Sequence, residues 1–316
     1  MQRDRRAFLK TSLGSIAGLG CVPLLGSLGG CQHNPQRTPA GRVSLATTKI
    51  SDRINVISGA PGNVVVFNSG EGMVLVDSGS ALAASALQQS LGSASVRTLF
   101  NTHYHADQTG GNALYAKAGA LIHAHTITKQ WLAADYYMPA EDRWVKAPPK
   151  EAVPTVTFRG KGEMKAGVET IEFGYLLEAH TRGDAYVLFR DSNVLAVGDV
   201  VSPLRDPALD WYAGGWLGGR ADAMDDLLEL VNDQTLVVPA YGKVMTRAEL
   251  VAERELIAKL YDATSDLYHH GNSAQDMLDK GVLKDVGRVF QDPQRFLYDV
   301  VKGLQAHYTN FGGNVV

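Results

Sequence analysis

A short apolar run at residues 96–101 ends beside three polar side chains spaced two residues apart: His103, His105 and Asp107. The run is typical of a buried β-strand, and alternate residues of an extended backbone point to the same side. The three side chains should therefore leave the strand end together, and imidazole and carboxylate groups are common zinc ligands. The competing interpretation is a pair of solvent-facing loop histidines, because an H-x-H-x-D segment alone favours a metal only modestly.

Two further metal donors stand next to predicted strands later in the chain. His180 lies between two such strands, and Asp199 follows the apolar run 194–197. The only cysteines are Cys21 and Cys31, so a metal site in the body of the chain must use histidine, aspartate or other oxygen donors. Three histidine ligands would leave a fourth zinc position for water.

Segments typical of strands alternate with segments of helical periodicity from residue 43 onward, which predicts an α/β fold. Residues 221–231 are predicted to be an amphipathic helix. The stretch 136–154 holds four prolines and two tyrosines, and we expect a long surface loop near a site. Thr246 and Glu249 form a capping-box-like start to a helical tail.

Length and charge narrow the class of protein further. The chain has 316 residues, of which 45% are hydrophobic, enough for one well-buried domain with a helical extension. Its formal net charge is −3, although the first thirty residues are basic. Nucleic acid is bound by a basic surface, so the expected partner is a small-molecule substrate and not a nucleic acid.

The N-terminal segment 1–30 is predicted to be a cleaved export signal. Arg5 and Arg6 precede a Phe-Leu-Lys run, as in twin-arginine signals, and an uncharged, glycine-rich stretch follows. A short transmembrane anchor is the alternative. The stretch ends in Leu-Gly-Gly before Cys31, which resembles a lipoprotein cleavage box. We therefore expect a periplasmic or cell-envelope protein, held at the membrane only by a lipid on Cys31. The alternative is ordinary cleavage nearby, with Cys31 incidental. Residues 31–42 would be a tether.

The order of short motifs between residues 53 and 247 resembles the metallo-β-lactamase superfamily. These motifs are, in sequence, Asp-Ser-Gly at 77–79, H-x-H-x-D at 103–107, Gly-Gly-Asn at 110–112, His-Thr-x-Gly-Asp at 180–184, Gly-Asp at 198–199 and Val-Pro-x-x-Gly at 238–242. Each motif alone is weak, but together they are specific. The resemblance implies an αββα sandwich with metals at one edge of its two sheets. Residues 43–316 would form this domain, with a helical C-terminal part from about 246.

The resemblance also implies a role for individual residues. The ligands of a first metal would be His103, His105 and His180. Asp199 would match a carboxylate that bridges two metals. Asp107 would match the aspartate that binds the second metal and orients the attacking water, and Asp77 a buried aspartate that supports the site.

Two of the family's second-metal ligands are replaced here. Gln108 stands where the family has a histidine after H-x-H-x-D, and Tyr241 replaces the histidine of a Pro-Gly-His-Gly segment. A glutamine amide and a neutral phenol are poorer zinc ligands than imidazole. We therefore favour one zinc ion per chain. The alternatives are a second metal held by Asp107, Asp199 and a Tyr241 phenolate, or a fold that has lost catalysis. Gln108 and Tyr241 could also be substrate contacts at the mouth of the site.

An aromatic, glycine-interrupted loop at 210–219 leaves two interpretations open. Trp211 and Trp216, with Tyr212 between them, form either a packed corner or a wall of a substrate pocket. The function expected from the whole pattern is hydrolysis of a small amide, ester, lactone or thioester by a zinc-activated water, with Asp107 as the catalytic acid–base group. The alternative is a non-catalytic metal-binding envelope protein of the same fold.

Overall fold

The computed structural model describes residues 43–284 and 286–312. The predicted signal and tether, and with them Arg5, Arg6 and Cys31, lie outside the described residues. Among the helices in the described part of the chain, none combines the length and apolar character that crossing a membrane requires.

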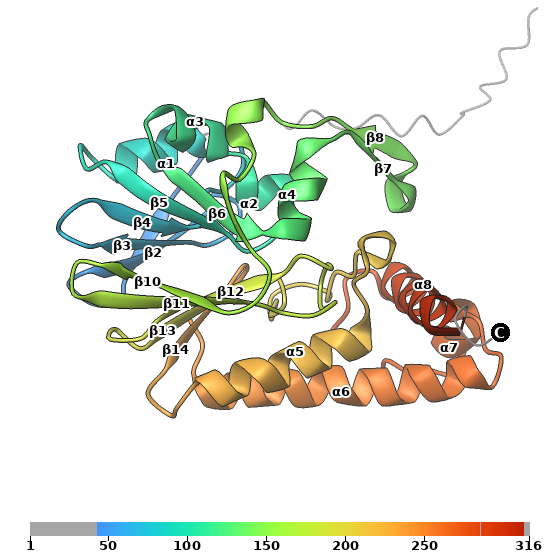
Figure 1. Ribbon diagram of the computed structural model, residues 1–316. Coiled ribbons are helices and arrows are strands. Elements are labelled where there is room, and N and C mark those ends of the chain that lie inside the picture. The colour runs from blue at the N-terminus through green and yellow to red at the C-terminus, as the bar shows by residue number, and fades with distance from the viewer. Residues whose placement is uncertain (1–42, 285, 313–316) are drawn as a thin grey trace, which may run out of the picture. The chain divides into compact units, whose positions relative to one another are not determined.

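Two β-sheets pack face to face (Figure 1). The first sheet contains, in hydrogen-bonded order, β1 (Ala46–Lys49), β2 (Ile54–Ser58), β3 (Val64–Asn68), β4 (Met73–Val76), β5 (Val96–Asn101), β6 (Leu121–His125) and β9 (Val156–Phe158). The second contains β10 (Gly162–Ala166), β11 (Glu169–Tyr175), β12 (Ala185–Phe189), β13 (Val194–Gly198) and β14 (Leu236–Pro239). Between them lies a core that includes Phe67, Phe100, Phe173 and Phe189.

Helices cover the outer face of each sheet. Buried side chains of α1 (Ala84–Ser90) and α3 (Asn112–Lys117) pack on the first sheet, and those of α5 (Leu217–Leu230) and α6 (Arg247–His269) pack on the second. The short helix α7 (Ala274–Asp279) and the long helix α8 (Pro293–Gly312) continue the helical tail and share the core beneath α5 and α6. The layers are therefore helix, sheet, sheet and helix, which confirms the predicted αββα sandwich and its helical C-terminal part.

Strand direction places polar residues at one edge of the sandwich. Strands β4, β5, β6 and β9 are parallel neighbours, so their carboxyl ends lie at the same edge of the first sheet. Strands β13 and β14 are parallel in the second sheet. The segments after β4, β5, β13 and β14 are those that carry the motif residues, so the topology gathers them at one edge of the sandwich.

Local structure departs from the sequence predictions in three places. Residues 136–154 were expected to be a loop, but β7 (Tyr136–Met138) and β8 (Arg143–Val145) pair as a hairpin. Two of the three residues in each strand are aromatic or β-branched, and such residues favour strands. The polar edge strand β10 was not predicted. Helix α5 begins at Leu217, four residues before the expected start, because Gly218 and Gly219 pack against the Trp216 ring and the Glu178 carbonyl, where a side chain would clash.

The start of the helical tail agrees with its local signal. Thr246 caps α6 by accepting a hydrogen bond from the backbone N–H of Glu249, whose carboxylate accepts one in return from the backbone of Thr246. The predicted capping box is confirmed.

Candidate metal centre

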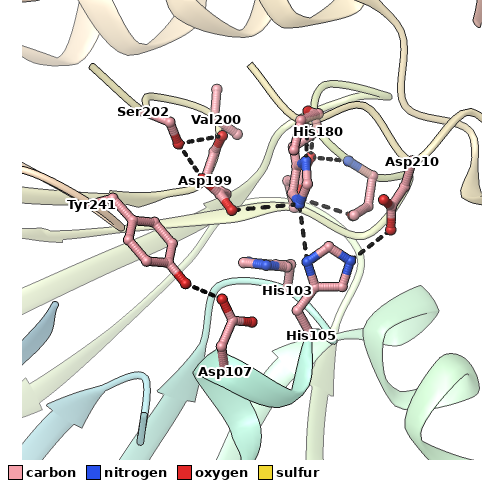
Figure 2. Close-up of polar contacts among 12 residues, drawn as sticks. His103, His105, Asp107, His180, Asp199, Val200, Ser202, Asp210 and Tyr241 are labelled. Carbon is pink, nitrogen blue, oxygen red and sulfur yellow. Dashed lines mark hydrogen bonds and ion pairs between the residues drawn. The ribbon is translucent and has the colours of Figure 1, made fainter. Parts of the chain in front are cut away.

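Three histidines from both sheets meet at the edge of the sandwich. His103 lies in the bend that follows β5, and His105 is in extended backbone just before the short helix α2 (Ala106–Thr109). His180 lies on the connection between β11 and β12. The three rings stand nearly perpendicular to one another, with centroids 4.7 to 4.9 Å apart and interplanar angles of 78° to 87°. Figure 2 shows them converging, with Asp199 beside them.

One potential ligand atom from each of His103, His105, His180 and Asp199 lies within 4.8 Å of the others. His103, His180 and Asp199 are almost fully buried. The Nε2 atom of His180 lies 3.3 Å from Nδ1 of His105 and 3.8 Å from an oxygen of Asp199. Among described residues, Nε2 of His103 is buried and has no hydrogen-bond partner. An orphaned imidazole nitrogen among other nitrogen and oxygen donors fits a bound metal ion.

The other ring nitrogen of each histidine has a protein partner. His103 Nδ1 lies 3.1 Å from the Thr102 hydroxyl, which itself donates to Asp77 over 2.8 Å. His105 Nε2 lies 2.6 Å from Asp210, and His180 Nδ1 donates to the Ala208 carbonyl over 2.9 Å. These contacts orient each ring and leave His103 Nε2, His105 Nδ1 and His180 Nε2 facing the common centre.

The charges suit a cation at this point. Burial, followed by the neighbouring rings of His105 and His180, lowers the pKa of His103 well below its usual range, so its imidazole is neutral and able to bind a metal. Burial opposes ionisation of Asp199, but His180 and then Arg205 attract its charge more strongly and hold its pKa below the ordinary range. The centre therefore offers a neutral imidazole beside a carboxylate.

Asp107 and Tyr241 form a second pair of polar side chains beside the histidines and Asp199. The Tyr241 hydroxyl donates to an Asp107 carboxylate oxygen (Figure 2). Burial, and after it the Asp107 charge, raise the pKa of Tyr241, so the phenol is protonated. Asp107 is half-buried and stands outside the four-residue cluster, and Arg205 pairs with Asp199 on this side.

A cavity of about 440 Å³ opens beside the cluster. It is lined by His105, Asp107, Arg205, Asp210, Tyr212 and Asp299, together with residues of the β7–β8 hairpin. The stretch 136–154 thus lies near the site, as expected, although as a hairpin.

The four residues proposed as second-site or substrate contacts lie outside the lining of this cavity, and one of them, Tyr241, borders a separate hollow. Gln108 is fully buried, and its side-chain amide packs against Gly62, so it does not stand at the mouth. Trp216 packs in the helical core, and its ring stacks on His307 with centroids 3.6 Å apart. Trp211 donates to Asp299 and borders a neighbouring hollow. Of the aromatic loop, Tyr212 is the residue that lines the cavity.

Sequence reasoning missed four residues that hold the site. Thr102 and Asp210 orient histidines, Arg205 pairs with Asp199, and Arg220 binds backbone carbonyls of the loop that carries Asp199. Thr102 directly precedes His103, so its position was a usable signal. The others act across the fold, and no local pattern marks them.

The comparisons with known proteins agree with this geometry. The family model of the metallo-beta-lactamase superfamily matches residues 57–241. A metallo-beta-lactamase type 2 from Bacillus cereus is 24% identical over 258 residues, which cover 77% of this chain and 95% of the relative.

Solved structures share the fold at low sequence identity. A metallo-beta-lactamase from Pontibacter korlensis superposes with a TM-score of 0.56 at 22% identity, over 68% of this chain and 99% of that one. The inverting sec-alkylsulfatase Pisa1 from Pseudomonas sp. gives a TM-score of 0.61 at 17% identity, over 85% of this chain and 50% of that one.

Proposed function

The chain belongs to the metallo-beta-lactamase superfamily, and we propose that it is a zinc-dependent hydrolase of a small amide, ester, lactone or thioester with one zinc ion per chain. The observation that carries the proposal is the set of three ring nitrogens, on His103, His105 and His180, that face one point while their other nitrogens are held by protein partners. A preorganised three-histidine shell is typical of a catalytic zinc site with one open position.

Bound zinc supplies Lewis acidity, which lowers the pKa of water and polarises a carbonyl or ester bond. The three histidines would hold the ion, and Asp210 would keep His105 in the tautomer that binds it. Asp107 lines the cavity beside His105, which supports the proposal that it would orient the attacking water and accept its proton. Tyr241 donates to the same carboxylate and fixes its orientation. The cavity next to these groups has room for a small substrate.

The replaced ligands support a count of one zinc. Tyr241 is engaged with Asp107 as a protonated phenol, which is a weak zinc ligand. Gln108 is buried against Gly62. Elemental analysis of the purified protein should give close to one zinc per chain, and His103→Ala should remove it. Two tightly held ions in the wild-type protein would contradict the proposed count.

Hydrolysis is tested by a screen over β-lactams, lactones, thioesters, carboxylic esters, phosphodiesters and sulfate esters. On whichever substrate responds, Asp107→Asn should lower kcat about a hundredfold or more and leave the zinc content unchanged, because it removes the base and keeps the shape. Full activity in Asp107→Asn would show that Asp107 is not the base. Glu141→Gln, a change of another acid that lines the cavity, is the matched control.

A metal-binding protein without hydrolysis is the second candidate. The hydrogen bond from the Tyr241 hydroxyl to Asp107 favours this candidate, because it engages the carboxylate that would act as the base. In that case the protein binds zinc, but no substrate in the screen is turned over faster by wild type than by His103→Ala.

A further inference from the structure

Arg205 lies between the two acidic residues of the centre and ties them to Tyr241. Its guanidinium donates to Asp199, and the guanidinium carbon stands 3.6 Å from the centroid of the Tyr241 ring. The Tyr241 hydroxyl in turn donates to Asp107. The four side chains form one connected set that adjoins the histidine cluster at Asp199.

The burial of Asp199 explains why a cation is needed there. Its side chain is 0% exposed, and a buried carboxylate without a compensating charge is strongly destabilising. One carboxylate oxygen of Asp199 accepts a hydrogen bond from the Ser202 hydroxyl. The other accepts one from the Arg205 guanidinium and also lies 3.8 Å from Nε2 of His180. The guanidinium is 32% exposed and lines the cavity, so it is the charged group that stands between Asp199 and the substrate space.

A metal ion bound between Asp107 and Asp199 would have to occupy the same side of Asp199. The guanidinium already neutralises the carboxylate and places its bulk and its positive charge there. The guanidinium and a second metal ion would both lie at contact distance from this carboxylate, and their mutual repulsion is only weakly screened at a buried group.

We propose that Arg205 is the second cation of this centre: its guanidinium takes the place beside Asp199 and Asp107 that a second metal ion would need, and so limits the centre to one ion. The inference rests on the proposed function in that the histidine cluster must bind zinc. It assigns the limit to the presence of Arg205 rather than to the loss of histidine ligands alone.

The test counts metal ions in a background that regains an imidazole ligand. Tyr241→His serves for this, because the Tyr241 side chain reaches Asp107, whereas the Gln108 side chain is packed against Gly62. After dialysis at fixed free zinc, Tyr241→His should still hold one ion per chain, because Arg205 remains on Asp199. Tyr241→His with Arg205→Ala should hold two. Tyr241→His with Arg295→Ala should hold one, since Arg295 lines the same cavity but pairs with Asp299.

Two results would overturn the inference. One is a second zinc ion in Tyr241→His while Arg205 is present, a result that does not depend on any change at position 205. The other is a count of one in the Arg205→Ala double variant when circular dichroism shows that it is folded. A wild-type chain that takes no zinc would overturn the proposed function, and this inference with it, so the two failures are distinguishable.

Discussion

The orientation of His105, a proposed zinc ligand, depends on a single carboxylate. Asp210 accepts from its Nε2 at 2.6 Å and also accepts a hydrogen bond from the Tyr104 hydroxyl. Burial opposes ionisation of Asp210, but the charge and hydrogen bond of His105, together with His180 and the Tyr104 hydroxyl, outweigh it and hold the Asp210 pKa below its usual range. The carboxylate is thus charged at neutral pH, and it both fixes the ring and makes Nδ1 a stronger donor to a metal.

Replacing Asp210 by alanine should therefore weaken zinc binding about tenfold to a hundredfold, because partners of this kind typically contribute that much to metal affinity. Competition with a chromogenic chelator measures the change. Asp299→Ala is the control, since Asp299 lines the same cavity but bonds to Trp211 and Arg295. Equal loss in the two variants would mean that general disturbance of the cavity, and not the contact with His105, is responsible.

The residues that could be predicted at this scale are those that carry a local signal. His103, His105 and His180 stand beside predicted strands, and the structure brings them together with Asp199. Asp210 and Arg205 were not predicted, because which polar group meets a given ring depends on the path of the loop 199–216. That path is decided by contacts with distant elements.

At the scale of elements, helix α5 holds this loop through one buried arginine. Arg220 is 0% exposed, and its guanidinium donates to the backbone carbonyls of Asp199, Val200 and Ala208. The Ala208 carbonyl also accepts from His180 Nδ1. Burial lowers the pKa of Arg220 to about 10, so it is still charged at neutral pH. Arg220 thus holds the backbone of Asp199, a proposed metal ligand, and also the Ala208 carbonyl that orients His180.

Arg220→Met should lower the free energy of unfolding by about 3 to 5 kcal/mol, because it leaves three buried carbonyls without their donor. It should also weaken zinc binding, since the loop that orients His180 and Asp199 is released. Urea unfolding and chelator competition measure the two effects. Arg254→Met is the matched control. Arg254 on α6 pairs with Asp225 on α5, but both side chains are partly exposed, so loss of this ion pair should cost at most about 1 kcal/mol. A similar cost for the two variants would contradict the role given to Arg220.

Elements with strong local signals were predictable, and those decided by packing were not. The start of α6 follows from Thr246 and Glu249 alone. The start of α5 does not, because glycines are poor helix formers, and here Gly218 and Gly219 are helical on account of the close approach of Trp216 and Glu178. Strand β10 alternates half-buried and exposed residues at a sheet edge, so no apolar run marks it.

At the scale of the whole molecule, the sandwich could be predicted because the motifs and their order along the chain resemble those of the metallo-β-lactamase superfamily. Most of the motifs lie at the end of a strand, and the parallel strands bring those ends to one edge; Gly-Gly-Asn at 110–112 lies between α2 and α3 instead. The packing of the helical tail was not predictable in this way. Helix α8 folds back and stacks the His307 ring on Trp216, and no local pattern in the sequence marks this contact.

The proposed export signal lies outside the described residues, and it has its own test. Replacing Arg5 and Arg6 together by lysine should leave the protein in the cytoplasm, because the export receptor reads the arginine pair. Cys31→Ser should release the exported protein from the membrane fraction, since one thioether-linked lipid group would be lost. Fractionation with an antibody against the mature chain measures both. Exported Cys31→Ser protein that stays membrane-bound would favour the anchor interpretation of residues 11–30.

The metal centre joins the two halves of the sandwich, so zinc should stabilise the whole fold. His103 and His105 extend from the first sheet, whereas His180 and Asp199 belong to the second. An ion bound by both can remain only while the sheets stay packed, and binding to the folded state alone adds RT ln(1 + [L]/Kd) to the free energy of unfolding. Free zinc at a thousand times Kd should add about 4 kcal/mol.

For a chain of this size, that gain corresponds to a rise in Tm on the order of 10 °C between chelator-treated and zinc-loaded protein. Thermal unfolding followed by circular dichroism measures it. His103→Ala should show little rise, because it removes one of the two histidines that the first sheet supplies and so weakens zinc binding. A rise of equal size in His103→Ala would mean that zinc binds elsewhere. Hydrogen exchange then locates the effect: added zinc should slow exchange at the ends of β5 and β13 in wild type, while the far end of each strand, remote from the ion, changes less.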